Sequence, residues 1–160
     1  MTTFVQRAME FAVFMHADQK YGNFPYIVHL SDVVKNLRLY DYDDDDTLAA
    51  GFLHDVMEDC HVTELMLAHR FSDRTAKLVD AVTGVGANRK ERKASTLSKL
   101  PHYPKAIPLK MADRLANIEN CHKFNSRLLE MYKKEFEDYD EMFESTNHKM
   151  NKVIRKYLKG

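Results

Sequence analysis

The chain has 160 residues, and its 24 basic residues balance its 24 acidic ones, so the formal net charge is zero. This length predicts one domain with a sizeable core, and the neutral balance argues against a general attraction to nucleic acid or membrane surfaces. The two cysteines, Cys60 and Cys121, fit neither a zinc-site spacing nor a disulfide framework. The sequence offers no signal peptide and no apolar run long enough to span a membrane. We therefore expect a soluble, cytoplasmic protein with no membrane partner.

Apolar residues recur at helical spacing along most of the chain, which predicts an all-α fold. The first helix should end near Asp18, a loop should follow over 19–25, and Ser31 should be the N-cap of the second helix. A third helix should follow the aspartate run at 43–46 and carry the apolar segment around residue 53. Further helices are expected over 63–70, 73–83, 88–99 and 104–121, with a long final helix over 126–158 that is interrupted near Ser145.

The segment LHDVMED at 53–59 places His54 and Asp55 side by side in an apolar run. Neither residue gains by facing a core unpaired, but both become useful if their nitrogen and oxygen atoms bind one cation. On a helix the two side chains would lie about 100° apart, close enough for adjacent positions around one ion. Glu58 and Asp59 follow one helical turn later and extend the same acidic face.

Two distant residues could complete a metal site. His29 follows the PYI segment at the start of the second helix, and Asp113 lies in the apolar segment LKMADRLANI, where an unpaired carboxylate is costly to bury. Two histidines and two carboxylates suit Mn²⁺, Fe²⁺ or Zn²⁺. Taken alone, either His29 or Asp113 would more often be a hydrogen-bonded structural residue. The remaining histidines have no comparable context and are interpreted as packing or surface residues.

With these residues identified, the chain resembles the HD superfamily of metal-dependent phosphohydrolases. It is most similar to the small alarmone hydrolases, single-domain relatives of the hydrolase half of RelA/SpoT enzymes. The resemblance is strongest over 4–120 and implies an HD-type domain over 1–160, a compact helical bundle whose C-terminal helices at 126–158 carry no recognised motif. The matching blocks are AMEFAVFMHADQ, PYIVHLSDVV, AAGFLHDVMEDCHVT, RFSDRTAKLVDAVTG, RKERK and LKMADRLANI.

The resemblance implies a role for each of several residues. The metal ligands would be His29, His54, Asp55 and Asp113, holding one divalent ion that is usually Mn²⁺. Glu58 and Asp59 would be the catalytic pair that orients and deprotonates the attacking water. The residues implied to bind substrate are Lys20, Arg92, Lys93, Lys110, Arg114 and Asn117.

The resemblance also implies an activity, the removal of pyrophosphate from the 3′ position of guanosine tetra- or pentaphosphate in the stringent response. The loop QKYGNFP is shorter than usual in the family and has Lys20 as its only cation, so the base preference stays open. Alternatives with the same metal chemistry are NADPH, a pyrophosphorylated tRNA end or a nucleoside monophosphate, including action as an antitoxin against a toxic synthetase. The neutral charge disfavours tRNA. A non-catalytic nucleotide-binding regulator is a further alternative. It is disfavoured because the predicted metal ligands and the acidic pair at Glu58 and Asp59 are all present.

Four aromatic residues are candidates to stack on a base, although most tyrosines in a helical domain simply pack. These residues are Tyr21, Phe24, Tyr26 and Tyr103. In RKERK, Arg89 and Lys90 offer cations as well, but Arg92 and Lys93 align best with the family.

Overall fold

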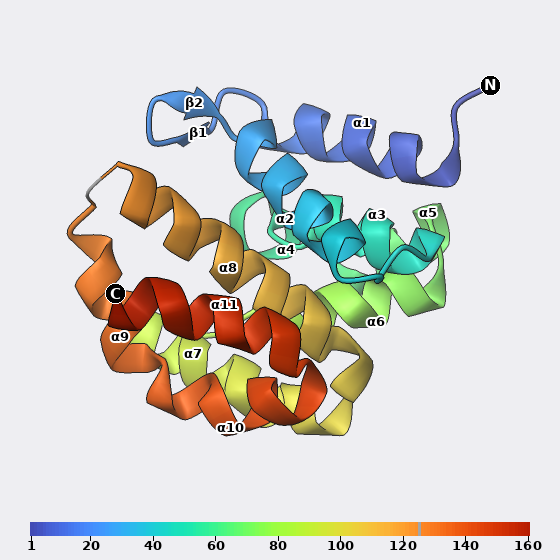
Figure 1. The fold of residues 1–160 in the computed structure, drawn as a ribbon. Coiled ribbons are helices and arrows are strands. Elements are labelled where there is room, and N and C mark those ends of the chain that lie inside the picture. The colour runs from blue at the N-terminus through green and yellow to red at the C-terminus, as the bar shows by residue number, and fades with distance from the viewer. Residues whose placement is uncertain (125) are drawn as a thin grey trace.

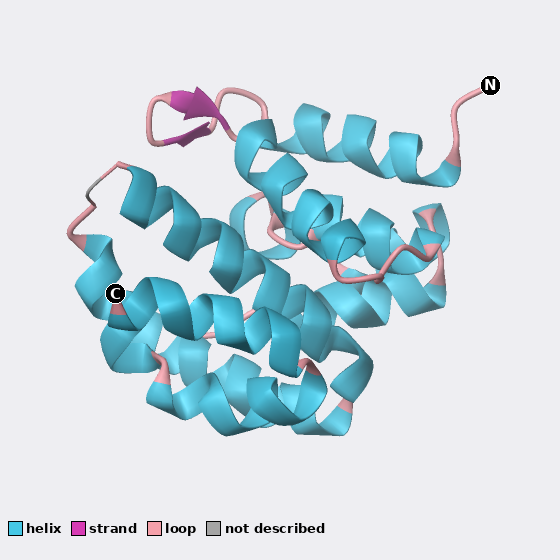
Figure 2. Ribbon diagram, in the orientation of Figure 1, coloured by secondary structure: helices cyan, strands magenta, loops and turns pink. Residues whose placement is uncertain are grey.

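The computed structural model describes residues 1–124 and 126–160. Within this part of the chain the fold is helical, and the strands are confined to one short hairpin (Figure 2). The N-terminal elements are α1 (Phe4–His16), β1 (Lys20–Tyr21), β2 (Phe24–Pro25), α2 (Ile27–Leu39), α3 (Asp45–Leu53), α4 (Val56–Asp59), α5 (Glu64–Arg70) and α6 (Asp73–Val82). The remaining elements are α7 (Arg89–Lys99), the 3₁₀ turns η1 (Leu100–His102) and η2 (Pro104–Ala106), α8 (Ile107–Lys123), α9 (Leu128–Glu135), α10 (Glu137–Thr146) and α11 (His148–Lys159). The predicted all-α fold is confirmed.

Helix α8 is the centre of the arrangement. It packs against α2 and α3 on one side and against α10 and α11 on the other (Figure 1). Leu109, Met111, Ala112 and Ile118 on α8 are completely buried. This two-sided burial explains why LKMADRLANI is apolar almost all round, and it places Asp113 in the interior of the molecule.

Polar side chains define where several helices begin. Asp44 accepts a hydrogen bond from the backbone N–H of Thr47 and caps α3, with Asp45 and Asp46 in its first turn. Carboxylates in this position satisfy free N–H groups and face the positive end of the helix dipole. The aspartate run therefore has a local structural role at the start of α3.

The hairpin was not predicted. Segment 19–25 was expected to be a loop, but β1 and β2 pair antiparallel within it, with Lys20 opposite Pro25. Gly22 forms the turn with a φ of 59°, a conformation that is easiest for a residue without a Cβ. In this short pairing Tyr21 lies beside the turn, opposite Phe24, and Tyr26 follows β2 directly.

Two helix ends in the N-terminal region differ from the prediction. Helix α1 ends at His16, two residues before the expected end near Asp18, because Ala17 has a φ of 46° that cannot continue a right-handed helix. Helix α2 begins at Ile27, directly after the hairpin, so Ser31 is an exposed residue inside the helix and not its N-cap.

His54 and Asp55 do not lie within a helix, as the periodicity had suggested. Helix α3 ends at Leu53 and α4 begins at Val56, so the pair forms the turn between the two helices. Asp55 has φ −105° and ψ −3°, outside the usual helical range. Leu53 and Val56 are completely buried and anchor the turn on both sides.

The predicted long C-terminal helix is three helices, α9, α10 and α11. The break at Asn147 lies two residues from the predicted interruption near Ser145, and the break at Phe136 was not predicted. Asn147 caps α11 by accepting a hydrogen bond from the N–H of Met150, and α11 folds back against α8 and α10. Folding back lets α10 bury Tyr139 and Phe143 in the core, which a single straight helix could not do.

The other predicted helices are found within two residues of their expected ends, except that the 104–121 segment opens as the 3₁₀ turn η2 and continues to Lys123. Among the described residues, none of the helices combines the length and apolar composition that crossing a bilayer requires.

Candidate active site

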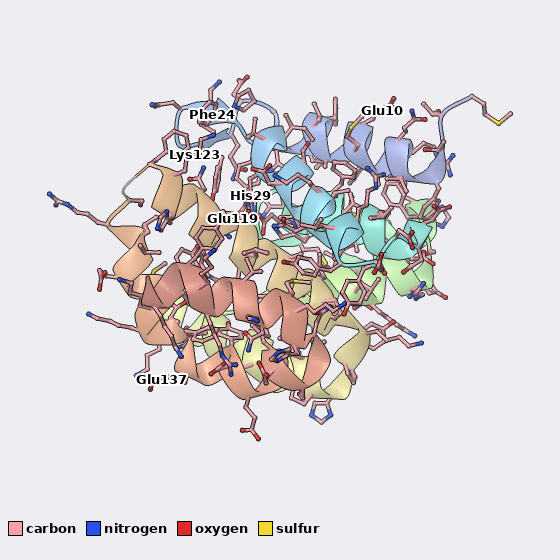
Figure 3. The ribbon with its side chains drawn as sticks, viewed as in Figure 1. Glu10, Phe24, His29, Glu119, Lys123 and Glu137 are labelled. Carbon is pink, nitrogen blue, oxygen red and sulfur yellow. The ribbon has the colours of Figure 1, made fainter. Side chains whose placement is uncertain are left out.

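Four side chains from three segments meet at one point beneath the hairpin. His29 comes from the first turn of α2, His54 and Asp55 from the α3–α4 turn, and Asp113 from α8. The two histidine Nε2 atoms are 3.3 Å apart, and Oδ1 of Asp113 lies 3.2 Å from Nε2 of His29 and 3.3 Å from Nε2 of His54. Oδ2 of Asp55 lies 3.1 Å from Nε2 of His54. Figure 3 shows His29 in the interior of the fold.

This donor set fits a cation. Nδ1 of His54 lies 2.8 Å from the carbonyl oxygen of Gly51, a contact that assigns the ring proton to Nδ1 and leaves the Nε2 lone pair facing the cluster. Both histidines are at most 3% exposed, and three ligand atoms, from His29, His54 and Asp55, lie within 4.8 Å of one another. Buried nitrogen and carboxylate lone pairs that face each other repel unless a proton or a metal ion lies between them. The cluster can therefore hold a divalent ion.

The two carboxylates are held in their ionised form. Burial alone would raise the pKa of Asp55, but the neighbouring His54, in its protonated form, lowers it to about 2. Burial acts in the same direction on Asp113, but Lys110 and His54 hold the pKa of that carboxyl well below its usual value. Ionised carboxylates are the form that binds metal ions.

Tyr26 supports the cluster from the base of the hairpin. Its hydroxyl donates a 2.6 Å hydrogen bond to Oδ2 of Asp55, and its ring packs on His16 with centroids 4.4 Å apart. Tyr26 was predicted as a candidate to stack on a base. Its hydroxyl and ring are instead engaged with Asp55 and His16.

Tyr21 connects the other side of the hairpin to α8. Its hydroxyl donates a 2.6 Å hydrogen bond to Oδ1 of Asn117, whose Nδ2 donates to Oδ1 of Asp113 at 3.0 Å. The Tyr21 ring also stacks on His29, with centroids 4.6 Å apart and planes 19° apart. Both hydrogen-bonding ends of the Asn117 amide are thus used to position the cluster.

The acidic pair on α4 divides between two environments. Glu58 lines the same cavity of about 160 Å³ as the histidine and aspartate cluster, and its carboxylate accepts a hydrogen bond from the N–H of Gly84. Burial raises the pKa of Glu58 above its ordinary value, although the Gly84 hydrogen bond acts in the opposite direction. Asp59 faces a neighbouring hollow and accepts a 3.0 Å hydrogen bond from Nε2 of Gln19.

Cationic side chains form the far wall of the cavity. Three of them, Arg89, Lys110 and Arg114, line it together with the cluster. Arg92 and Lys93 line an adjoining cleft of about 90 Å³, which also contains Glu135. Lys20 is exposed on β1 and lies outside both lining sets.

Arg92 and Lys93 were predicted to bind substrate in preference to Arg89, and Glu135 was not predicted to have a role. Arg89 lines both the cavity and the cleft because α7 begins beside α9, where Glu135 receives its two guanidinium hydrogen bonds. A search for oppositely charged residues far apart in the sequence could have suggested this contact, because helical periodicity gives information only about residues a few positions apart.

A larger, mostly apolar pocket of about 620 Å³ lies between the hairpin and the end of α8. Asn117 and Tyr132 line both this pocket and the 160 Å³ cavity at the histidine and aspartate cluster, so the two spaces adjoin. Phe24, a predicted base-stacking residue, lines the pocket, whereas Tyr103 does not. Other lining residues are Tyr21, Gly22, Asn23, Asn120, Cys121, Phe124, Ser126 and Leu128.

A model of the HD domain matches residues 8–138, which include all four members of the cluster. The chain belongs to the HD domain family. The chain is similar to a protein of Aquifex aeolicus named guanosine-3′,5′-bis(diphosphate) 3′-pyrophosphohydrolase, which is 37% identical over 126 residues, or 75% of this chain and 18% of the relative. A protein of Spiroplasma citri with the same name is 41% identical over 81 residues, or 46% of this chain and 11% of the relative.

A third relative, named as a probable GTP pyrophosphokinase of Mycobacterium leprae, is 33% identical over 124 residues, which are 71% of this chain and 15% of the relative. The chain thus spans less than a fifth of the length of each of these three relatives. A solved structure described as "A metazoan ortholog of SpoT hydrolyzes ppGpp and plays a role in starvation responses" superposes with a TM-score of 0.85 over 99% of this chain and 96% of the other. At 21% identity, this match shows a common fold.

Proposed function

We propose that this protein is a metal-dependent hydrolase that removes pyrophosphate from the 3′ position of guanosine 3′,5′-bis(diphosphate), with the cytoplasm as its location. The observation that carries the proposal is one cavity that contains the cluster of His29, His54, Asp55 and Asp113 together with Glu58 and a cationic wall. Membership of the HD domain family and the names of its relatives support it.

His29, His54, Asp55 and Asp113 would be the ligands of a single ion, for which we propose Mn²⁺. The mixed nitrogen and oxygen set suits Mn²⁺, with Fe²⁺ and Zn²⁺ as related choices. When bound, the ion would act as a Lewis acid toward the phosphoryl group and favour formation of the hydroxide nucleophile.

The chain's own residues would perform the remaining tasks. Glu58 borders the cavity and has a raised pKa, which suits a residue that accepts the proton of the attacking water. Asp59 would assist from the adjoining hollow. Arg89, Lys110 and Arg114 would stabilise the negative charge that develops on the transferred group. Attack at the phosphorus bound to the 3′ oxygen would release pyrophosphate and leave a 3′ hydroxyl.

The nucleoside would lie in the larger pocket next to the hairpin. Asn117 and Tyr132 line both spaces, so a nucleotide can extend from one to the other. Phe24 and Phe124, whose ring centroids are 5.8 Å apart, supply aromatic surface for a base. Lys20, Arg92 and Lys93 were expected to bind substrate, and of these Arg92 and Lys93 line the cleft beside the cavity.

The test is a substrate comparison with the purified chain and Mn²⁺. Guanosine 3′,5′-bis(diphosphate), NADPH and a nucleoside monophosphate are incubated in parallel, and the products are separated by anion-exchange chromatography. The proposal expects guanosine 5′-diphosphate and pyrophosphate from the first compound at the highest kcat/KM. Faster release of phosphate from NADPH would assign a different substrate to the same metal chemistry.

A further inference from the structure

Glu135, the last residue of α9, is shared by two arginines. Its Oε1 accepts a 2.8 Å hydrogen bond from Nε of Arg89, and its Oε2 accepts hydrogen bonds from Nη2 of Arg89 and Nη1 of Arg114, both at 3.1 Å. The Glu135 side chain is 12% exposed. One carboxylate therefore compensates two guanidinium groups in a poorly solvated place, where such charge-assisted hydrogen bonds are strong.

Arg114 has donors that Glu135 does not satisfy. Its side chain is 4% exposed, and its Nε and Nη2 atoms find no acceptor among the described residues. The guanidinium lies over the Tyr139 ring, 4.2 Å from the centroid, which limits its rotation. Buried polar atoms nearly always have a partner. Because Arg114 lines two cavities and has N–H groups without an acceptor, we expect an anionic ligand to bind beside it.

The cleft around these residues has the size and charge for a phosphate group. At about 90 Å³ it is much smaller than the 620 Å³ pocket beside the hairpin, so a nucleoside would not fit. The cleft also shares Glu58, Arg89, Lys110 and Arg114 with the 160 Å³ cavity. Its lining contains five cations and two carboxylates, namely Arg89, Arg92, Lys93, Lys110, Arg114, Glu58 and Glu135. Of the five, Lys93 already pairs with Asp138, and Lys110 with Asp113.

We propose that the cleft is the subsite for the distal phosphate of a pyrophosphoryl group, and that Glu135 is an internal counterion which that phosphate displaces from Arg89 and Arg114. The inference rests on the proposed function and adds to it a specificity-determining residue from the C-terminal helices. A phosphate carries more charge and more acceptor oxygens than a carboxylate, so it can compete with Glu135 for Arg89 and Arg114. When product leaves, Glu135 returns to the two arginines and weakens the hold of the cleft on pyrophosphate.

The test is the binding of inorganic pyrophosphate and of orthophosphate to the full chain, measured by isothermal titration calorimetry. It compares the wild-type protein with Glu135→Gln, and with Glu137→Gln as the control. Glu137 is exposed only two residues away and lies at the outer edge of the molecule, away from His29 (Figure 3). Each protein is titrated both metal-free and loaded with Mn²⁺, so that the variant is always compared with the wild type in the same state.

Pyrophosphate should bind more tightly than orthophosphate, and Glu135→Gln should tighten pyrophosphate binding by about tenfold, because a charged competitor for the two arginines is gone. Glu137→Gln should change nothing. Equal or weaker pyrophosphate binding by Glu135→Gln would show that Glu135 only positions the arginines, and would overturn the proposal. Binding of pyrophosphate no tighter than that of orthophosphate would also overturn it.

A second variant, Glu135→Asp, keeps the proposal testable if Glu135→Gln does not fold. Glu135→Asp keeps the charge but draws the carboxylate back from both guanidinium groups, and it should give a smaller tightening in the same direction. These titrations need neither turnover nor nucleotide, so failure of this subsite is distinguishable from failure to hydrolyse guanosine 3′,5′-bis(diphosphate).

Discussion

The hydroxyl of Tyr26 donates a 2.6 Å hydrogen bond to Oδ2 of Asp55, the oxygen that lies 3.1 Å from Nε2 of His54. The Tyr26 ring is packed on His16 and cannot turn away easily. The orientation of one proposed metal ligand is therefore set by a residue at the base of the hairpin, outside the His-Asp pair itself. Partners of this kind orient ligands and tune metal affinity.

Tyr26→Phe tests this relationship. The substitution keeps the ring and removes the hydrogen bond, so the affinity for Mn²⁺ should fall by about 10–100-fold. The measurement is calorimetric titration of the metal-free protein with Mn²⁺, with Tyr103→Phe as the control. An unchanged Mn²⁺ affinity in Tyr26→Phe would show that Asp55 is oriented without it.

Gln19 positions Asp59 in a similar way. Nδ1 of His16 lies 2.9 Å from Oε1 of Gln19, which leaves Nε2 of Gln19 to donate to Oδ2 of Asp59 at 3.0 Å. Gln19→Met has a similar length but no hydrogen-bonding group. If Asp59 assists the base, kcat should fall by about tenfold, since general-base assistance depends on geometry, while KM should stay nearly constant.

Steady-state kinetics give both constants for Gln19→Met, and Asp18→Asn, an exposed neighbour, is the control. A raised KM with kcat unchanged would instead assign Gln19 to substrate binding.

The raised pKa of Glu58 makes a prediction about pH. As a base, Glu58 must be ionised, so kcat should fall as the pH drops through its pKa. Because burial raises that pKa, the fall should occur at a higher pH than it would for an ordinary, solvent-exposed glutamate. The measurement is kcat against pH, with bound Mn²⁺ measured at each point so that loss of metal is not mistaken for protonation.

Glu58→Gln should keep Mn²⁺ and lower kcat by about 10²–10⁴-fold, the usual contribution of general-base catalysis. Turnover close to that of the wild type would remove Glu58 from the mechanism.

Glu135 should stabilise the fold in a pH-dependent manner. Burial opposes ionisation of Glu135, but the hydrogen bonds and charges of Arg89 and Arg114 outweigh it and lower its pKa. A lowered folded-state pKa contributes stability above the unfolded value, and this contribution is lost as the pH falls through the folded value. At neutral pH, Glu135→Gln should lower the free energy of unfolding by about 1 kcal/mol, since solvent screens the half-exposed Arg89.

Urea unfolding of both proteins at neutral and acid pH measures this effect. The difference between wild type and Glu135→Gln should shrink in acid. A difference that is the same at both pH values would mean that the ionic contacts of Glu135 do not stabilise the fold.

The cluster of His29, His54, Asp55 and Asp113 was largely predictable because polarity and hydrophobic pattern conflict at its members. His54, Asp55 and Asp113 are ionisable residues in apolar segments, and burial without partners would be costly. The structure brings these three together with His29. The turn at His54 and Asp55 could not be foreseen, since neither glycine nor proline marks it and the apolar pattern on both sides remains helical.

The side-chain contacts around the cluster could not be predicted from the sequence, for a different reason. Arg89 and Glu135 are 46 residues apart, and Tyr21 and Asn117 are 96 apart. Contacts over such separations depend on how helices pack, and local periodicity contains no information on them. The short hairpin was missed because two residues per strand leave too little alternation to recognise.

The proposed reaction is tested by incubating guanosine 3′,5′-bis(diphosphate) with the Mn²⁺-loaded wild-type protein and with its Asp55→Ala variant, and resolving the products by anion-exchange chromatography. We expect guanosine 5′-diphosphate and intact pyrophosphate in equal amounts from the wild type, and no turnover or bound metal in the variant. Unchanged substrate at high enzyme concentration, or cleavage at the 5′ end, would contradict the proposed reaction.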